Sequence, residues 1–389
     1  MQLMILFAGD PFCWRFARYI NEGLKQSAPY RLCFIRNCKG ENIMTTENNS
    51  APGQQVPPDA YIIQLAFSAM LSQALYVAAK LGVADLLAEK PLPVSELAAR
   101  TNTHERSLYR LLRSLAGAGV FEETDPKVFA LTPYAEPLRS DVPNSLRNGA
   151  IFMGEEWHWK VWGNMLYSVQ TGKPAWGQVH GAEVFDYFTA NPEQADIFNR
   201  AMTDGSVGTA PAVVESYDFS SFKTIADIAG GHGYLLSQVL KANPDVKGIL
   251  FDAPSVIAGA GALLEKEEVA TRVEKVSGDF FESVPQGADA YMMKHIIHDW
   301  DDERSIKILK NIRASMPDHG KVLIIETVVP SGSEPHYSKL LDLEMLVSPG
   351  GLERTAEEYQ ELLKAAGFRL TRIIPTQSPY SIIEAVKAN

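Results

Sequence analysis

The chain has 389 residues, of which 46% are hydrophobic and 21% charged, a composition typical of a globular protein long enough for two domains. Its 47 acidic residues outnumber 36 basic ones, and the net charge of −11 argues against a nucleic acid or an anionic membrane as the main partner. Polar residues interrupt the apolar runs before they reach the roughly 18 residues that a membrane span needs, so we expect no span.

The N-terminal residues 1–58 differ from the rest of the chain. All three cysteines, Cys13, Cys33 and Cys38, lie there, so no disulfide framework or zinc site is expected elsewhere, and a cytoplasmic location follows. No basic segment precedes the first apolar run, which disfavours a secretory signal. We interpret residues 1–58 as a non-core extension and polar linker, with the functional protein beginning near Met44; a small targeting or docking arm is the alternative.

Residues 59–145 are predicted to form a winged-helix-like dimerisation domain. Over residues 61–87, apolar residues recur at helical spacing on a nearly uncharged background, and so long an apolar face suggests burial against a partner subunit. Helix, turn, helix and hairpin then follow in order: a helix capped by Ser95, a turn at Thr101 and Thr103, a helix ending at Gly117 or Gly119, and strands at 120–123 and 128–132.

Winged helices are best known for reading DNA, so a ligand-sensing regulator is the alternative function for this domain. Residues 59–140 hold eight basic and nine acidic residues, and the predicted wing tip carries Glu122, Glu123 and Asp125. Phosphate contacts supply much of the affinity for DNA, and this surface would repel phosphates. The charge pattern therefore favours a dimerisation and substrate-covering module.

Residues 146–222 are predicted to be mostly helical and are rich in aromatic side chains. Such a cluster is either protein core or the wall of a pocket for a flat ligand, and both interpretations stay open. The pocket candidates here are Phe152, Trp157, Trp176 and Phe185. We interpret the segment as a helical connection that lines the substrate site.

Over residues 223–389, strand-like and helical segments alternate, which predicts parallel strands with crossover helices in a doubly wound α/β sheet. The expected strands are 224–229, 247–252, 272–279, 288–295 and 321–329, and the expected helices are 234–242, 255–266, 301–316 and 355–366. Two final strands, 368–376 and 381–388, are joined by four residues and can pair only as antiparallel neighbours.

The stretch TIADIAGGHG, residues 224–233, predicts a strand followed by a glycine-rich turn into a helix. Gly230, Gly231 and Gly233 let the turn pass close beneath a ligand at the carboxyl ends of the strands. The spacing matches neither the dinucleotide fingerprint nor the phosphate-binding P-loop. Asp227, just before the glycines, suits an ammonium group better than a pyrophosphate.

Further acids stand at the ends of the next two predicted strands. Asp252 is placed to accept hydrogen bonds from both hydroxyls of a ribose, Asp279 is placed to accept one from an amine, and Phe280 is placed to stack on a flat base. Each acid alone could be a helix cap. An ammonium site, a ribose site and a base site in this order fit one ligand, S-adenosylmethionine.

From about residue 60 to its end, the chain resembles the small-molecule O-methyltransferases typified by caffeic acid and hydroxyindole O-methyltransferase. The matching stretches, in the family's order and spacing, are DIAGGHG, FDAPSVI, GDFF, KHIIHDWDDE, IIETVVP and GGLERTAEEY. Two positions depart from the family, because Ala229 stands where glycine is usual and His232 replaces a small hydroxyl residue. The resemblance implies a Rossmann-like methyltransferase domain over residues 223–389, behind the helical winged-helix domain, with S-adenosylmethionine as cofactor.

The resemblance also assigns roles within MMKHIIHDWDDE, residues 292–303. It implies that Lys294 closes over the adenosine side of the cofactor and that His298 is the catalytic base, whereas His295 falls at a variable position and is interpreted as structural. A metal site at His295, His298 and Asp299 would need ligands that converge from one face. The segment instead leaves a strand for a loop, so we expect no metal.

The other site residues are implied in the same way. Glu326 and Glu353 match the two glutamates that flank the histidine, where they would hold its ring and stabilise the imidazolium. Met202 matches the methionine beside the acceptor ring, and Ser206 matches the serine near the cofactor's carboxylate. Further candidates for the substrate pocket are Trp176, Phe185 and Met345.

Together these residues predict a homodimeric enzyme that transfers a methyl group from S-adenosylmethionine to a phenolic hydroxyl of a small aromatic or polyketide-like molecule. A phenol has a pKa of about 10 and stays mostly protonated at neutral pH, so a neutral His298 would take its proton. The remaining alternative is a relative that uses the cofactor for non-methylating chemistry. Such a relative would be expected to lack the base, which is present here.

Overall fold

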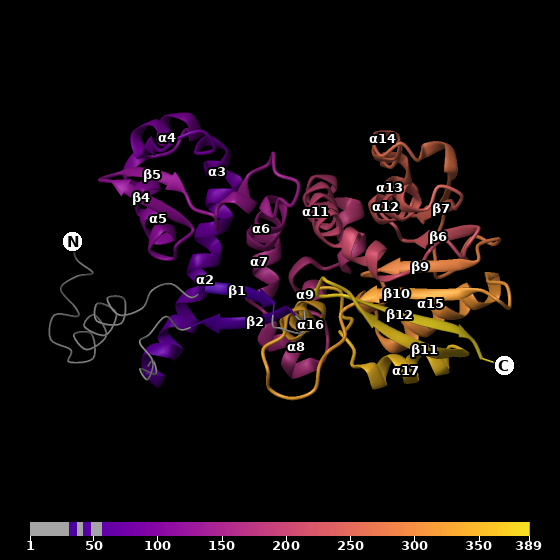
Figure 1. Cartoon of the computed structure of the whole chain (residues 1–389). Helices are drawn as coiled ribbons and strands as arrows, with labels where there is room; N and C mark the ends of the chain where they lie inside the picture. The colour runs from indigo at the N-terminus through magenta and orange to yellow at the C-terminus, as the bar shows by residue number, and fades with distance from the viewer. Residues whose placement is uncertain (1–30, 37–41, 48–56, 389) are drawn as a thin grey trace. The chain divides into compact units, whose positions relative to one another are not determined.

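The computed structural model describes residues 31–36, 42–47 and 57–388. Most of the predicted extension 1–58 therefore lies outside the described residues, apart from β1 (Arg31–Arg36) and β2 (Asn42–Glu47), which form a two-stranded sheet. Contacts divide the chain into two compact units, with the main boundary between Gly154 and Glu155. We call the part before this boundary the N-terminal unit and the part after it the sheet unit, and Figure 1 labels the elements of both.

The N-terminal unit is helical and contains one small sheet. Its elements are α2 (Pro58–Lys80), α3 (Val83–Leu86), β3 (Leu92–Pro93), α4 (Val94–Thr101), α5 (Glu105–Gly117), β4 (Phe121–Asp125), β5 (Val128–Leu131), the 3-10 turn η1 (Glu136–Leu138) and α6 (Arg147–Gly154). The sheet has the antiparallel order β3-β5-β4, which is the predicted wing with β3 as an additional strand. Leucines of α4 and α5 form one buried core with Phe121 and Phe129 of the wing.

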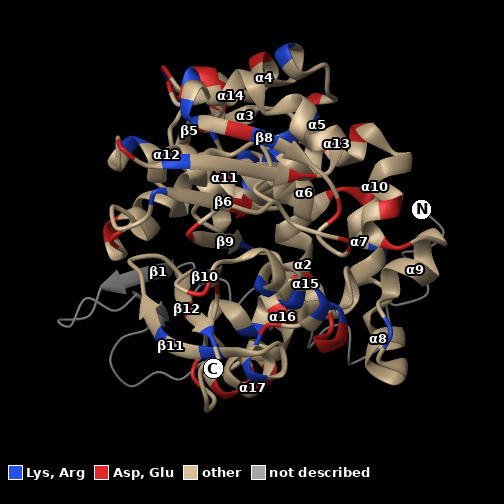
Figure 2. Ribbon diagram, turned by 90° about the vertical axis from the view of Figure 1, so that its right-hand side faces the viewer, with Lys and Arg blue, Asp and Glu red and all other residues tan. Residues whose placement is uncertain are grey.

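The helix-turn-helix differs from the prediction at one end. Pro93 is the N-cap of α4 and Ser95 lies within its first turn, with no side-chain capping bond, so the predicted Ser95 cap is wrong. The following turn is as expected, with Asn102 at a φ of 51°. Figure 2 shows both signs of charge on α4, where Arg100 pairs with Glu96.

The first half of α2 is apolar and exposed in the single chain, on all sides of the helix. The large side chains on it are between 39% and 63% exposed: Tyr61, Ile62, Leu65, Phe67, Met70 and Leu71. Among the helices of the described residues, α2 alone is long and apolar enough to cross a membrane by length and composition. This finding corrects only the statement that no apolar run is long enough, because residues 60–79 contain no charged residue and only Gln and Ser interrupt the run.

The sheet unit begins with five helices, as predicted for this part of the chain. They are α7 (Glu156–Trp162), α8 (Met165–Thr171), α9 (Ala175–His180), α10 (Val184–Ala190) and α11 (Pro192–Ser216). Their aromatic rings pack on one another, with ring centroids 5.9 Å apart for Trp157 and Trp176 and 5.7 Å apart for Trp176 and Phe188. Rings packed edge to face at this spacing form a stable core.

A seven-stranded sheet follows, in the order β11-β12-β10-β9-β6-β7-β8. Its strands are β6 (Thr224–Ile228), β7 (Lys247–Asp252), β8 (Val273–Ser277), β9 (Ala290–Lys294), β10 (Lys321–Glu326), β11 (Phe368–Pro375) and β12 (Ser381–Lys387). The first five are parallel, and β12 pairs antiparallel with both β10 and β11. The predicted doubly wound sheet is confirmed, and its strand order changes direction between β6 and β9, where such sheets bind ligands.

Both faces of this sheet are buried by helices (Figure 1). Tyr291 and Met293 of β9 belong to one buried cluster with residues of α15 (Asp302–Ser315) and α17 (Ala356–Ala365). Their neighbours Ala290 and Met292 belong to a second cluster, with residues of α11 and α12 (Tyr234–Ala242). Alternate side chains of a strand point to opposite faces, so nearly continuous apolar runs are required here.

Two helical segments of the sheet unit differ from the prediction. The helix expected at 255–266 is two short helices, α13 (Pro254–Gly259) and α14 (Gly261–Lys266), because glycines on both sides of Ala260 favour a break. The 3-10 turn η2 (Ala270–Arg272) then leads into β8. An unpredicted helix, α16 (Tyr337–Val347), lies between β10 and α17.

Candidate active site

The predicted site residues gather at the carboxyl edge of the parallel strands. Asp252 is the last residue of β7, Lys294 of β9 and Glu326 of β10, while Asp227 is the last but one of β6. Asp279 follows β8 by two residues, and Asp252 pairs with Ser277 in the register of β7 and β8. The acids at three successive strand ends therefore lie along one edge.

The glycine-rich turn after β6 needs small residues because it approaches neighbouring groups closely. A Cβ at Gly230 would lie 2.6 Å from Cγ of Asp227, whereas a Cβ at Gly231 would meet no atom within 4 Å. Gly231 and Gly233 have positive φ angles of 62° and 86°. Ala229 also has a positive φ, 54°, a conformation that glycine adopts without strain and that explains why glycine is usual at this family position.

Asp252 is held by the backbone and keeps acceptor capacity for a ligand. Its Oδ2 accepts a hydrogen bond of 2.8 Å from the Gly231 N–H, and its Oδ1 accepts one of 2.7 Å from the Ala253 N–H. Burial raises the pKa of Asp252, and these two N–H groups oppose the rise. A carboxylate has about four lone-pair sites, so two further donors can be accepted here.

Asp227 and Lys294 interact electrostatically on the neighbouring strands β6 and β9. Asp227 is 2% exposed, and burial raises its pKa to about 7 against the opposing effect of Lys294. Burial lowers the pKa of Lys294 to about 8, while Asp227, Glu326 and Asp299 oppose the change. Lys294 thus lies among the carboxylates at the middle of the edge.

Asp279 and Phe280 lie together in the loop after β8. Asp279 is exposed, and its Oδ1 accepts a hydrogen bond of 2.7 Å from the Phe281 N–H. The ring of Phe280 is half-buried and lies 4.8 Å from that of Phe281 and 6.0 Å from that of Trp300, measured between centroids. An exposed carboxylate beside a partly exposed ring is suited to the edge and face of a flat base.

His298 lies in the short 3-10 turn η3 (Ile297–Asp299) after β9 and is 4% exposed. Its Nδ1 is 2.6 Å from Oε1 of Glu353, whose other oxygen accepts a hydrogen bond from Thr327 Oγ1. This contact leaves Nε2 of His298 as the ring nitrogen available for proton transfer. The nearest charged group to Nε2 is Asp299, with Oδ1 at 3.5 Å.

The charges around His298 favour its protonated form. Burial alone would lower the pKa of His298, but Asp299, Glu353 and Glu326 raise it to about 9. Burial raises the pKa of Asp299 to about 7, and His298 opposes that rise. The imidazolium that forms when His298 accepts a proton is therefore strongly stabilised.

Glu326 does not hold the imidazole ring, which corrects one of the expected contacts. It is fully buried, and its Oε1 accepts hydrogen bonds from the backbone N–H groups of Ile296, Ile297 and His298 at 3.0, 2.7 and 3.2 Å. Its Oε2 accepts one from the Tyr359 hydroxyl at 2.5 Å. Glu326 therefore positions the backbone of the base, whereas Glu353 is the glutamate that contacts its ring.

His295 has the features of a structural residue. It adopts a positive φ of 58°, which ends β9, and its ring packs at 4.4 Å on Tyr380 and at 4.8 Å on His298. Burial lowers the pKa of His295 well below its usual value, and Lys294 and His298 lower it further. The neutral ring cannot add positive charge beside the base. Among the described residues, no group of three or more histidine, cysteine or acidic side chains is placed to hold a metal.

The candidate acceptor residues differ in exposure. Met202 and Phe185 are each 36% exposed, and the ring of Phe185 lies 5.4 Å from that of Trp300. Ser206 is half-buried on α11, where its hydroxyl donates to the Met202 carbonyl at 2.9 Å. Met345 is 6% exposed, and Trp176 is 1% exposed inside the aromatic cluster, which favours the core interpretation of Trp176.

A buried polar cluster beside Met345 was not found from the sequence. Glu344 of α16 lies with Oε1 2.9 Å from Nε2 of His158, and its Oε2 accepts a 2.5 Å hydrogen bond from Nε1 of Trp162. The partners are more than 180 residues apart in the chain, so only the spacing of His158 and Trp162 on one face of α7 could have suggested it.

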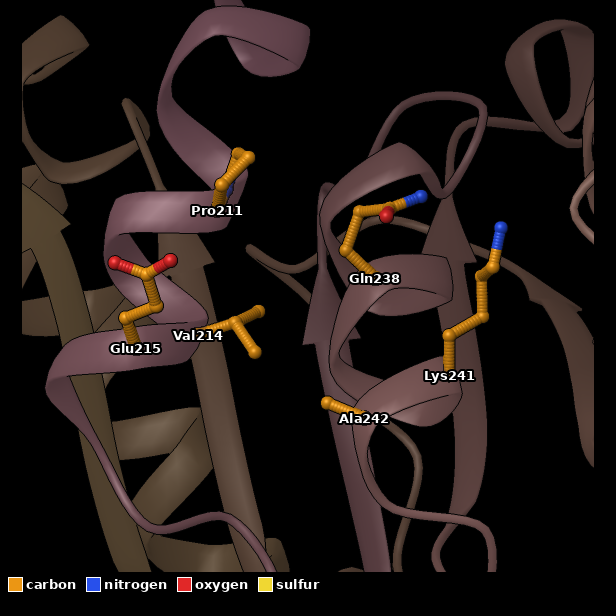
Figure 3. Close-up of a pocket in the computed structure, with 6 residues that line it drawn as sticks. All are labelled: Pro211, Val214, Glu215, Gln238, Lys241 and Ala242. Carbon is orange, nitrogen blue, oxygen red and sulfur yellow. The ribbon is translucent and has the colours of Figure 1, made fainter.

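A separate groove lies between α11 and α12, away from the strand-end acids. Pro211, Val214 and Glu215 line one side and Gln238, Lys241 and Ala242 the other, as Figure 3 shows. None of the predicted site residues lines it. Lys241 is paired with Glu267 at 3.0 Å.

The sequence and the fold both match known proteins. Residues 63–141 match the O-methyltransferase dimerisation domain, and residues 162–369 match the O-methyltransferase domain. The phenazine O-methyltransferase PhzM of Lysobacter antibioticus is 47% identical over 340 residues, which cover 87% of this chain and 99% of that protein. The crystal structure of LaPhzM, also 47% identical, superposes with a TM-score of 0.82 and covers 85% of this chain and 100% of that one.

A more distant structure has the same fold with the cofactor present. The human N-acetylserotonin methyltransferase, solved in complex with S-adenosylmethionine, has a TM-score of 0.79 at 27% identity and covers 87% of this chain and 100% of that one. The resemblance inferred from the motifs is confirmed by these matches. With both domains in order and the strand-end acids in place, this chain belongs to the family of S-adenosylmethionine-dependent O-methyltransferases.

Proposed function

We propose that this protein transfers a methyl group from S-adenosylmethionine to a phenolic hydroxyl of a small aromatic natural product, with His298 as general base. The observation that carries the proposal is the 2.6 Å contact between Nδ1 of His298 and Glu353. It directs Nε2 to the acceptor and stabilises the charge that His298 gains. A carboxylate performs the same task for the histidine of a serine-protease triad.

The described residues fit the cofactor. Asp227 is a buried carboxylate whose charged form a neighbouring cation, Lys294, favours, and an incoming ammonium group would favour it further. Asp252 keeps lone pairs for the ribose hydroxyls, and the space above Gly231 is open. We propose that Asp279, Phe280, Lys294 and Ser206 complete the site. The bound cofactor supplies an activated methyl group on a sulfonium.

The work left to the protein is alignment and proton removal. The hydroxyl must lie in line with the carbon–sulfur bond that breaks, so a fixed acceptor ring contributes much of the rate. As the oxygen–carbon bond forms, the hydroxyl proton passes to Nε2 of His298. Glu353 and Asp299, whose charges favour the imidazolium, stabilise the result. We assign acceptor contacts to Met202, Phe185 and Met345 and a supporting role in the core to Trp176.

The printed names of relatives support a ring-bearing acceptor. They include a phenazine O-methyltransferase, an O-demethylpuromycin O-methyltransferase and a 3-amino-4-hydroxybenzoate 4-O-methyltransferase. Among the aromatic helices of residues 155–222, the partly exposed ring of Phe185 supplies flat apolar surface of the kind that binds such rings.

A direct test combines cofactor binding with product detection. The purified protein should bind S-adenosylmethionine in a calorimeter with one site per chain. Incubated with the cofactor and a panel of phenols and hydroxyphenazines, it should give products heavier by one CH₂, detected by mass spectrometry. Cofactor binding without any methylated product from the panel or from a small-molecule extract would count against the proposed reaction.

We also propose that the protein is a cytoplasmic homodimer through the exposed first half of α2. The dimerisation-domain match covers most of that helix, and its exposed apolar residues are of the kind that pack in permanent interfaces. By its length and composition, α2 could also span a membrane. A second copy of the chain covers it without requiring the charged residues of the rest of the unit to approach lipid.

Charged residues introduced into the first half of α2 are expected to dissociate the dimer. The double substitution Ile62→Arg and Leu65→Arg should weaken dimerisation by roughly 10²-fold or more, because two exposed anchors are replaced by charges. Leu146→Arg, which alters an equally exposed leucine outside α2, should leave the dimer intact. Analytical ultracentrifugation at micromolar concentration measures both. A monomeric wild-type chain would refute the proposal.

A further inference from the structure

The loop that carries His298 is held through its backbone from two sides. On one side, its N–H groups at residues 296–298 converge on Oε1 of Glu326. On the other side, its carbonyl groups require donors, since buried carbonyls are costly to leave unpaired. The Ser305 hydroxyl donates to the Ile297 and Trp300 carbonyls, at 3.3 Å each. The shorter bonds from a side chain to these two carbonyls come from Arg354, the residue next to Glu353.

Arg354 is 1% exposed, which is unusual for a guanidinium. Its Nη1 donates to the Ile297 carbonyl at 3.2 Å, and its Nη2 donates to the Trp300 carbonyl at 3.0 Å. Its Nε and Nη2 reach Oδ1 of Asp302, at 3.1 and 2.8 Å. Asp302 is the first residue of α15, so the guanidinium ties the loop to the start of that helix.

The segment that carries Arg354 is itself fixed. A Cβ at Gly351 would lie 2.0 Å from the His298 carbonyl oxygen, so the backbone around Gly351 rests directly on the loop. The Arg354 carbonyl accepts a 2.9 Å hydrogen bond from the Val329 N–H, beyond the end of β10. Glu353 is anchored by its N–H, which donates to Asp342 at 2.9 Å. Consecutive residues of one rigid segment therefore hold the ring and the backbone of the base.

We propose that Arg354 is a positioning residue for the general base, in a role that rests on the methyl transfer proposed above. Its fork of donors fixes the carbonyls on both sides of His298, so that Nε2 keeps its place relative to the acceptor hydroxyl. Its positive charge is paired with Asp302 and lies within hydrogen-bonding distance of the residue before His298, where a cation disfavours the imidazolium. Lysine could supply the charge but not the planar fork.

Substitutions separate these two contributions. Arg354→Met removes the fork and the charge, so kcat should fall by ~10²-fold, as expected when a reacting group is misplaced by about 1 Å. Arg354→Lys keeps the charge and should lower kcat by roughly tenfold. KM for the acceptor and Kd for S-adenosylmethionine should change less than about threefold in both. Arg369→Met, at an exposed arginine of the same unit, is the control and should behave as wild type.

A second measurement needs no acceptor. In protein labelled at its eight histidines, the His298 resonance can be assigned by its loss in His298→Gln and titrated by NMR. Removing a nearby cation stabilises the imidazolium, so Arg354→Met should raise the pKa of His298, while Arg354→Lys should leave it unchanged. Should the wild type prove unable to methylate any acceptor, this titration would still test Arg354.

The outcomes are distinct. If Arg354 only stabilised the fold, Arg354→Met would melt at a lower temperature, but its kcat per cofactor-binding site and the pKa of His298 would match the wild type. That result would overturn the proposal. If Arg354→Met does not fold, Arg354→Lys decides, because a lysine enzyme with wild-type kcat would show that the fork is not required.

Discussion

Replacing His298 by glutamine should lower turnover by about 10² to 10⁴, the range expected for loss of a general base, while cofactor affinity stays within a few-fold. Glutamine can still donate a hydrogen bond to Glu353, so the buried carboxylate is not left unpaired and the fold should hold. Isothermal titration with S-adenosylmethionine and steady-state rates on the best acceptor measure the two effects. His319→Gln, at an exposed histidine paired with Asp289, is the matched control.

The pH dependence should identify the same residue. Only neutral imidazole accepts a proton, and Asp299, Glu353 and Glu326 outweigh burial to give His298 a pKa of about 9. The rate should therefore rise with pH below that value, by up to about tenfold per pH unit, and level off above it. The positive charge of a bound sulfonium would lower the pKa of His298 and so shift the rising part of the pH–rate profile to lower pH. Near wild-type turnover in His298→Gln, with an unchanged pH profile, would show that alignment alone drives the reaction.

Replacing Gly351 by alanine should cause the largest loss of stability. The new Cβ would lie 2.0 Å from the His298 carbonyl oxygen and 2.4 Å from the carbonyl carbon of Asp299, and neither backbone atom can move alone. We expect the free energy of unfolding to fall by ~3 kcal/mol or more, because overpacking against backbone cannot be relieved by a rotamer change. Denaturant unfolding measures the fall.

Turnover should fall with stability in this variant. Any relaxation that admits the methyl group pushes the base out of line, so the folded fraction of Gly351→Ala should lose at least ~10² in kcat. Gly149→Ala provides the control, since its Cβ meets no atom within 4 Å in helix α6 and alanine favours a helix. Equal stability of the two variants would show that the loop carrying His298 and the segment 350–355 do not touch in solution.

The sequence predicted the sheet well because its signals are local. Each parallel strand is a short apolar run that ends in a recognisable residue, and Asp227, Asp252, Asp279 and Lys294 could be placed at one edge from chain order alone. Helix α16 was missed for an equally local reason. Its N-cap is His336, whose Nδ1 accepts from the Ser338 N–H, and histidine is not among the residues that usually signal a helix start.

The contacts of the base were harder to predict because they join distant residues. The family resemblance placed Glu326 beside His298, but a sequence does not reveal that its partners are three backbone N–H groups instead of the ring. Trp176 illustrates a second limit. An aromatic residue in a helix has the same appearance in sequence whether it lines a pocket or fills a core, and only packing distinguished the two.

Trp300 has an implication for how this enzyme could acquire new acceptors. Its ring touches Phe280, on the side proposed for the adenine, and Phe185, on the side proposed for the acceptor, two residues after the base. A mutation in this loop would disturb both reactants and the proton transfer at once. Inherited changes of acceptor preference should therefore accumulate in the helices before the sheet, at positions such as Phe185 and Met202, while the loop itself stays constant across descendants.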